Sequence, residues 1–189
     1  MNEGRDGDAR TVRMTSGTAG PKTRRAWTTV GVRSLCAVAL LTAGTVHAGA
    51  LLDAKRLMKA GRFAEARAAF LPLAQGGNAD AEELIGVMYA MGLGVERDDE
   101  RAFEWYLRSA LKGHPGAQSG VGWYYEVGRG IPAPDLVRAY AWYVLSAIGG
   151  DPDAAVSQEE VVKKMSAEEI RRAKVLIGDY RPHLYPYRD

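Results

Sequence analysis

Apolar residues recur at helical spacing through most of the chain. Ala81, Ile85 and Tyr89 follow one another at intervals of four, and Val87 and Met88 widen the same apolar face. Such spacing places side chains on one side of an α-helix. No stretch of strand length in which apolar and polar residues alternate competes with this pattern. The sequence therefore predicts an all-α fold.

The helical pattern occurs in two complete copies. The matched segments are 81–89, 92–95 and 101–106 in the first copy, and 117–125, 128–131 and 138–143 in the second. The copies are 36 residues apart up to Ile131 and 37 residues apart afterwards, because one residue is inserted near Pro132–Pro134. A period of this length indicates a repeat protein in which neighbouring units bury one another's apolar faces.

Each copy is predicted to be a helical hairpin with a glycine turn. Gly92–Gly94 and Gly128–Gly130 follow the first helix and supply residues that adopt positive φ without steric cost. Asp98 and Asp135 are the expected N-caps of the second helices. The turns follow a helix and lack a subsequent Lys-Ser or Lys-Thr, so a structural turn is favoured over a phosphate-binding loop.

Two glycines fall in the middle of the first helices. Gly86 and Gly122 occupy equivalent positions, and a glycine inside a helix costs about 1 kcal/mol relative to alanine. We expect the missing side chain to let the second helix approach closely, with Ala102 and Ala139 as the opposing residues. The aromatic pairs Trp105–Tyr106 and Trp142–Tyr143 are then expected to pack between helices.

Weaker copies flank the two complete ones. Ala66, Ala74 and Gly77 lie 36 residues before their counterparts in the first copy, whereas the turn at Gly61–Phe63 is short and lacks the second glycine. The predicted organisation is a leader over 1–48, a degenerate hairpin over 49–77, complete repeats over 78–113 and 114–150, capping helices over 151–180 and a tail over 181–189.

The two complete copies resemble the Sel1-like repeat. Both match the pattern Ala-x3-[Leu/Ile]-Gly-x2-Tyr-x2-Gly-x-Gly, followed by Ala-x2-Trp-Tyr and Ala-x2-Gly. The first segment is more similar to a tetratricopeptide unit, and Met165–Glu169 followed by Ala173 resembles the closing helix of secreted bacterial members. The resemblance implies a right-handed α-solenoid that serves as an adaptor for other proteins.

Charge is distributed unevenly along the chain. Residues 1–48 contain seven Lys/Arg and three Asp/Glu, whereas the remaining residues contain 18 and 20, so a basic leader accounts for the overall charge of +2. This basic stretch runs into an apolar block, Leu35–Ala43, and then into Val46-His47-Ala48, whose small residues fit a signal-peptidase site. The block is too short to span a bilayer.

We therefore expect an exported protein, periplasmic or secreted, that is cleaved after Ala48 and not stably inserted in the membrane. An uncleaved anchor or a tail with an apolar centre is the alternative, and Met14 is an alternative start. The single cysteine, Cys36, lies in the leader. Cleavage would leave a mature chain without cysteine, which an oxidising compartment would not affect.

No catalytic or metal-binding constellation is visible in the sequence. The three histidines, His47, His114 and His183, are far apart, and no His-x3-His pair or strained serine turn accompanies them. Acidic clusters such as Asp98–Glu100 are best explained as charges at helix N-termini. We expect no catalytic residue, no metal site and no cofactor, and the small net charge gives no indication of nucleic-acid binding.

A binding surface is expected on the first helices, which line the concave groove in the solenoids that the chain resembles. Helical periodicity turns six residues towards this groove: Glu83, Val87, Met91, Ser119, Trp123 and Glu126. Lys55, Met58 and Lys59 extend the same surface upstream. An apolar centre flanked by charges is typical of a protein or peptide site. The alternative is that the capping helices cover part of it.

Two functional classes remain open. The first is a non-enzymatic scaffold that binds a protein or peptide in its groove. The second is a cell-wall-associated enzyme or regulator, because some secreted members of the resembled family are associated with β-lactamase-like activity. Those members are cysteine-rich, and this mature chain would contain no cysteine, so the scaffold is favoured.

Overall fold

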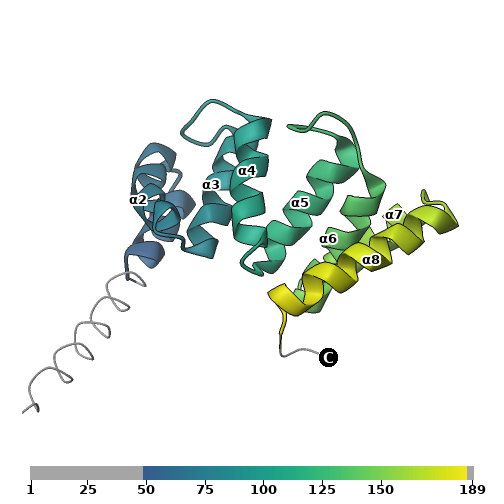
Figure 1. Ribbon diagram of the computed structural model, residues 1–189. Helices are drawn as coiled ribbons and strands as arrows, with labels where there is room; N and C mark the ends of the chain where they lie inside the picture. Colours follow the sequence, from purple (N-terminus) through teal and green to yellow (C-terminus); the bar gives the residue numbers. More distant parts are fainter. Residues whose placement is uncertain (1–48, 187–189) are drawn as a thin grey trace, which may run out of the picture. The chain divides into compact units, whose positions relative to one another are not determined.

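The computed structural model describes residues 49–186, and within them every regular element is helical. Residues 49–59 are helical, and seven further helices follow: α2 (Phe63–Gln75), α3 (Ala79–Met91), α4 (Asp99–Ala110), α5 (Pro115–Val127), α6 (Leu136–Gly149), α7 (Ala154–Val162) and α8 (Ala167–Leu184). Figure 1 shows their succession along the molecule. The expected leader, with its cleavage site after Ala48, lies outside the described residues.

Successive helices pack as hairpins that stack on one another. The most extensive contacts join α3 to α4 and α5 to α6, which are the two helices of each complete repeat. Contacts of α2 with α3 and of α4 with α5 link neighbouring hairpins, and α7 and α8 both pack against α6. The predicted all-α repeat solenoid is thus confirmed. The last helix runs to Leu184 and so includes the first four residues of the expected tail.

The first glycine of each turn ends a helix, and the second allows close contact with the preceding hairpin. Gly92 and Gly128 end the first helices with φ of 69° and 72°, in the left-handed region. The second glycine is required for packing as well, because a Cβ on Gly130 would lie 2.3 Å from the carbonyl oxygen of Asp99. A Cβ on Gly94 would lie 2.6 Å from the backbone nitrogen of Ala64. Each turn therefore rests on the first turn of the preceding hairpin's second helix.

The mid-helix glycines face aromatic rings. A Cβ on Gly86 would lie 3.2 Å from the ring of Tyr106, and a Cβ on Gly122 would lie 2.9 Å from the ring of Tyr143. Close approach of the second helix is as predicted, but the main contact differs from the expected one. The tyrosine ring fills the space, and the alanine contributes only the carbonyl oxygen of Ala102, 3.4 Å from the Gly86 Cβ.

Helix starts repeat the same hydrogen bonds in both repeats. The carboxylates of Asp98 and Asp135 each accept a bond of 2.9 Å from the backbone N–H three residues later, which confirms the predicted caps. Ser109 and Ser146, 37 residues apart, each donate a 2.8 Å bond to a carbonyl at the start of the first helix. These bonds tie the two ends of each hairpin together.

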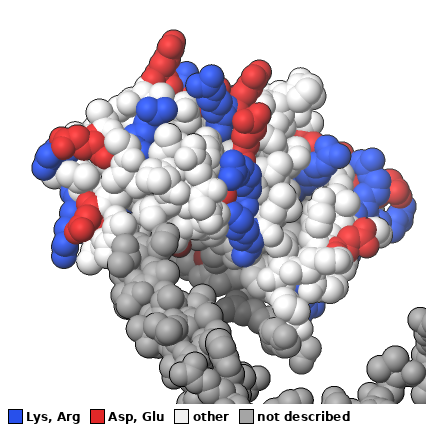
Figure 2. Space-filling model, turned by 60° about the vertical axis from the view of Figure 1, so that its left-hand side comes forward, with Lys and Arg blue, Asp and Glu red and all other residues white. Residues whose placement is uncertain are grey.

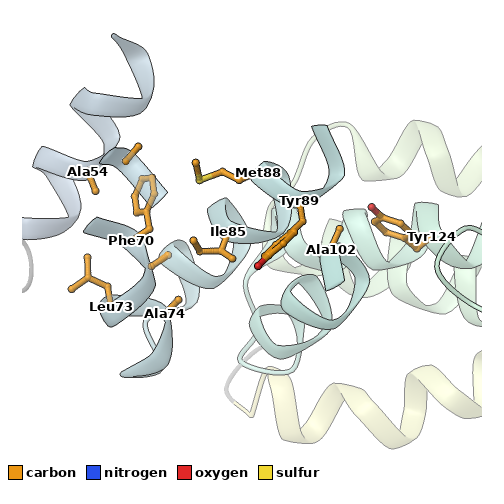
Figure 3. Packing of buried hydrophobic residues seen from close by; sticks show 11 residues of the cluster. Ala54, Phe70, Leu73, Ala74, Ile85, Met88, Tyr89, Ala102 and Tyr124 are labelled. Carbon is orange, nitrogen blue, oxygen red and sulfur yellow. The ribbon is translucent and has the colours of Figure 1, made fainter. Parts of the chain in front are cut away.

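The core runs through the stacked hairpins. Figure 3 shows buried side chains of 49–59, α2, α3, α4 and α5 packed into one cluster. Phe70, Ile85 and Met88 are completely buried there, and Tyr124 reaches the same cluster from the second complete repeat. Burial of these large side chains across hairpin boundaries is the main stabilising contribution to a stacked repeat.

The C-terminal helix closes the second complete repeat. Trp142 of α6 is stacked on Tyr180 of α8 with ring centroids 5.5 Å apart. Beyond the helix, the Tyr185 hydroxyl donates a 2.6 Å hydrogen bond to the side-chain oxygen of Gln118, which is buried in α5. Figure 1 shows α8 running past α6, against which it packs. This closing segment leaves Trp123 41% exposed, so it does not bury that side chain.

Candidate functional site

Equivalent positions of successive first helices form an exposed strip. Val87 and Trp123 are 36 residues apart, as are Met91 and Val127, and each pair therefore occupies the same place in its repeat. The first helix of the degenerate hairpin lies 32 residues before that of the first complete repeat, because its turn is shorter. This offset aligns buried Ala54 with buried Gly86, and it aligns Lys55 and Lys59 with Val87 and Met91. We define the first-helix strip as Lys55, Lys59, Val87, Met91, Trp123 and Val127.

Large apolar side chains of this strip are open to solvent. Met91 is 67% exposed, and Trp123 and Val127 are each 41% exposed, whereas Val87 is half-buried. The other tryptophans of the described residues are less exposed, since Trp142 is buried and Trp105 is half-buried. Exposed apolar residues that recur at one helix position are a typical sign of an interaction surface.

One end of the strip opens into an apolar recess. The recess has a volume of about 710 Å³, and its walls are formed by Leu52, Lys55, Arg56, Met58, Lys59, Phe63 and Leu84. Binding pockets for small apolar groups have volumes in this range. The recess therefore connects the two lysines of the strip with an apolar cavity between the 49–59 segment and α3.

A polar cluster lies beside the recess. The ammonium of Lys55 is 2.7 Å from a carboxylate oxygen of Asp80, and Nε2 of His114 is 3.5 Å from the other. The bond from Lys55 holds the pKa of Asp80 below its ordinary value. Glu83 lies one helical turn after Asp80, and burial raises its pKa to about 6. Three helices thus bring together titratable groups that are far apart in the sequence.

The histidine of this cluster, His114, has a structural role as a helix cap. Nδ1 of His114 accepts a 3.2 Å hydrogen bond from the backbone N–H of Ala117 and so caps α5. The proton of the neutral ring is then on Nε2, which faces Asp80. Burial lowers the pKa of His114, which favours this neutral form. Both ring nitrogens are occupied, so His114 lacks the free nitrogen that a general base needs.

Trp123 lies between core and solvent. Its ring meets the buried ring of Tyr124 edge to face, with centroids 5.1 Å apart. The guanidinium of Arg129, in the following glycine turn, is 5.9 Å from the centroid of the indole. The indole of Trp123 thus contacts the core through Tyr124, while its remaining surface faces Arg129 and solvent.

A family model for the Sel1 repeat matches residues 79–114 and 115–151. The chain contains two Sel1 repeats. They coincide with the hairpins α3–α4 and α5–α6, and proteins built from Sel1 repeats are generally protein-interaction scaffolds. No curated protein matches the sequence significantly.

Solved structures show the same fold. The protective antigen c5321 of uropathogenic Escherichia coli, which has an SLR fold, superposes with a TM-score of 0.71 at 22% identity, over 74% of this chain and 31% of that one. A Sel1 repeat protein from Oxalobacter formigenes gives a TM-score of 0.54 at 30% identity, over 69% of this chain and 60% of that one. The chain spans less than two thirds of either protein.

Not every predicted groove residue of the Sel1 repeats is available to a ligand. Glu126, expected at the charged rim, accepts a 3.0 Å bond from the Tyr143 hydroxyl and a 2.7 Å bond from the ammonium of Lys164. It therefore joins α5 to α6 and to the segment after α7. Ser119 is half-buried on α5, and Glu83 is half-buried beside the polar cluster.

Sequence reasoning predicted most residues of the strip but missed the polar cluster, Val127 and Arg129. In the sequence His114 stood out only as one of three widely separated histidines, whereas the structure makes it a half-buried helix cap. The signal was available, because a polar residue before Pro115 stands in the N-cap position that Asn78 occupies one repeat earlier. Val127 and Arg129 were not among the six predicted groove residues.

Three further observations concern charged patches, metal sites and membrane spans in the described residues. Basic and acidic side chains are interspersed on the face shown in Figure 2, and neither forms a broad patch there. Within residues 49–186, no group of three or more His, Cys, Asp or Glu is arranged to hold a metal ion. No helix of that part is both long and apolar enough to cross a bilayer.

Proposed function

We propose that this protein is an exported, non-enzymatic scaffold that binds a segment of a partner protein along the first-helix strip, in the concave groove of the solenoid. The observation that carries the proposal is the exposure of Met91, Trp123 and Val127 at two equivalent positions of successive Sel1 repeats. An aromatic anchor with aliphatic neighbours is the composition of a binding hot spot.

The packing of the repeats supports a binding role for Trp123. Its counterpart in the first repeat is Val87, so the hairpin can be built without an indole at this position. Tyr124, the next residue, is buried and supplies the aromatic contact to the core. Trp123 therefore presents apolar surface beyond what the hairpin requires.

A scaffold without catalytic activity agrees with the polar cluster. Lys55 and Asp80 neutralise each other, and His114 caps a helix.

Export is inferred from the apolar block and small-residue site of the leader, whose structure lies outside the described residues.

Photo-crosslinking tests the proposed surface. A benzoylphenylalanine introduced at Met91 or Val127 of the full chain, expressed in its native cell, should form a discrete crosslinked species on irradiation. The same group at Glu104, an exposed residue of α4, is the control and should not. Trp123→Ala should reduce crosslinking from Met91 while the protein remains folded by circular dichroism. Equal crosslinking from Glu104, or none from the strip, would contradict the proposal.

A further inference from the structure

Two cations at opposite ends of the first-helix strip have no acidic partner. Lys59 lines the apolar recess, and Arg129 lies against the indole of Trp123. Among the described residues, no carboxylate lies within 4.0 Å of either cation. Many other cations of the unit are paired, as in Lys55–Asp80 and Arg138–Asp135. An available positive charge thus lies at each end, on Lys59 within the strip and on Arg129 in the turn that follows Val127.

The acids near the strip do not neutralise these ends. Asp80 is paired with Lys55 at 2.7 Å, and Glu126 is bound by Lys164 and Tyr143. Glu83, half-buried beside Asp80, is not within 4.0 Å of Lys59 or Arg129. Between the two cations the strip presents Val87, Met91, Trp123 and Val127, which are apolar. A ligand that lies along the strip therefore meets a basic end, an apolar centre and a second basic end.

We propose that the partner segment has an apolar centre flanked by acidic residues on both sides. One acidic flank lies beside Lys59 while a bulky apolar side chain enters the adjoining recess, and the other flank lies beside Arg129. This inference rests on the proposed function, because it specifies the chemistry of the same surface. The protein's own leader has the wrong charge for this role, since residues 1–48 contain seven bases and only three acids.

Exposed charges of this kind affect which partner is chosen more than they raise the affinity for it. An exposed ion pair is weak, and salt screens it, so the apolar centre supplies most of the binding. Complementary charge nevertheless accelerates association, and like charges exclude wrong partners. The preference for acidic flanks should accordingly decrease as the salt concentration rises.

Two synthetic peptides test the inference against the full chain. Both are fluorescein-labelled and share one apolar centre of leucine, phenylalanine and valine. One carries three glutamates at each end and the other three lysines. We expect the acidic peptide to bind about tenfold more tightly at low salt in fluorescence anisotropy, a difference equal to a few exposed charge pairs.

Charge reversal locates the effect. Lys59→Glu and Arg129→Glu should each weaken the acidic peptide about fivefold and strengthen the lysine peptide. Lys174→Glu is the matched control, because Lys174 is an exposed cation of α8 away from the strip, and it should change neither. Circular dichroism verifies that each variant is folded.

The outcomes separate this inference from the proposed function. The charge preference is wrong, and the scaffold proposal stands, if both peptides bind equally or if Lys59→Glu and Arg129→Glu behave like Lys174→Glu. The same holds if the acidic peptide does not bind at about 1 mM, a concentration on the order of the dissociation constants of the weakest specific complexes. Tighter binding of the lysine peptide would instead favour basic segments such as the leader. If Leu84→Asp in the recess and Trp123→Ala in the strip both leave the two peptides unaffected, neither the recess nor the strip is the binding surface and both proposals are wrong.

Discussion

Glu82 and Gln118 occupy the same buried position in the two repeats but are satisfied in different ways. Glu82 is bound by Arg108 and Lys112 at 3.2 and 2.5 Å. Gly149 stands where the first repeat has Lys112, and a Cβ there would lie 2.5 Å from the Tyr185 hydroxyl. That hydroxyl binds Gln118 in place of the missing cation. A neutral amide with a neutral donor thus replaces an ion pair, and no buried charge is left unpaired.

Glu83 provides a prediction at the residue scale. Burial raises its pKa to about 6, and the nearby charge of Asp80 adds to this effect. The unfolded chain has the ordinary value of 4.5, so the folded protein binds the proton more tightly between these two pH values. The ionised carboxylate therefore destabilises the fold at neutral pH, and this cost disappears as the pH falls through 6 towards 4.5.

Glu83→Gln should consequently raise the free energy of unfolding by about 1 kcal/mol at pH 8, a value reduced from the full shift because the side chain is partly hydrated. Near pH 4.5 the gain should vanish, because the wild-type carboxyl is then protonated. Urea denaturation at several pH values measures the difference. Glu104→Gln, at an exposed position of α4, is the control and should show no such trend. A gain independent of pH would contradict the prediction.

At the scale of the element, the packing of each hairpin depends on glycines, whose missing side chains leave space for neighbouring residues. Gly86 and Gly122 admit tyrosine rings of the second helix, and Gly94 and Gly130 admit the preceding hairpin. Gly120 adds a contact that has no counterpart in the first repeat, where Leu84 occupies the position. A Cβ at Gly120 would lie 2.9 Å from the ring of Tyr106, which thus reaches from one repeat into the next.

Alanine substitutions at two helical glycines should have opposite effects. Gly122→Ala places a methyl group 2.9 Å from the Tyr143 ring, and such overpacking destabilises by about 1–3 kcal/mol. In Gly178→Ala nothing lies within 4 Å of the new Cβ, so only helix propensity changes and the protein should gain about 0.5–1 kcal/mol. Thermal and urea unfolding of both variants decide the matter. If both substitutions stabilise the protein, the hairpin packing described here is incorrect.

At the scale of the whole molecule, the stack is asymmetric. Its N-terminal hairpin has the shorter turn and carries the apolar recess, whereas α7 and α8 close the other end against α6. Exposed lysines, arginines and acids on α8 give that end a polar outer surface, as the terminal unit of a repeat stack requires. The first-helix strip remains open between these ends.

Processing of the chain provides a prediction at the same scale. Export should remove the leader after Ala48, because Val46 and Ala48 follow an apolar run of signal-peptide length. Intact-mass analysis of a periplasmic or secreted fraction should find a chain that begins at Gly49 or close to it. Val46→Arg together with Ala48→Arg, which removes the small residues, should block cleavage. Recovery of only the uncleaved chain in the cytosol would refute the export proposal.

The sequence was sufficient for the features that repeat. Two copies of one pattern predicted the hairpins, their glycine turns and the caps at Asp98 and Asp135, all of which the structure contains. The strip through Val87 and Trp123 followed from helical periodicity, since residues of one face recur every three or four positions. Glu126 shows the limit of that reasoning, because periodicity gives the face of a helix but not the neighbours that reach it.

What the sequence determined alone was therefore local and periodic: all-α structure, hairpins and the repeat itself. Only the tertiary structure decided which polar groups meet. Lys55 comes from the helix over 49–59, Asp80 from α3 and His114 from the cap of α5, and Tyr185 reaches Gln118 across 67 residues. Such contacts depend on how hairpins stack and on space left by residues such as Gly149. Helix propensity and periodicity act over a few residues, whereas these contacts arise from packing between segments that the chain order does not place together.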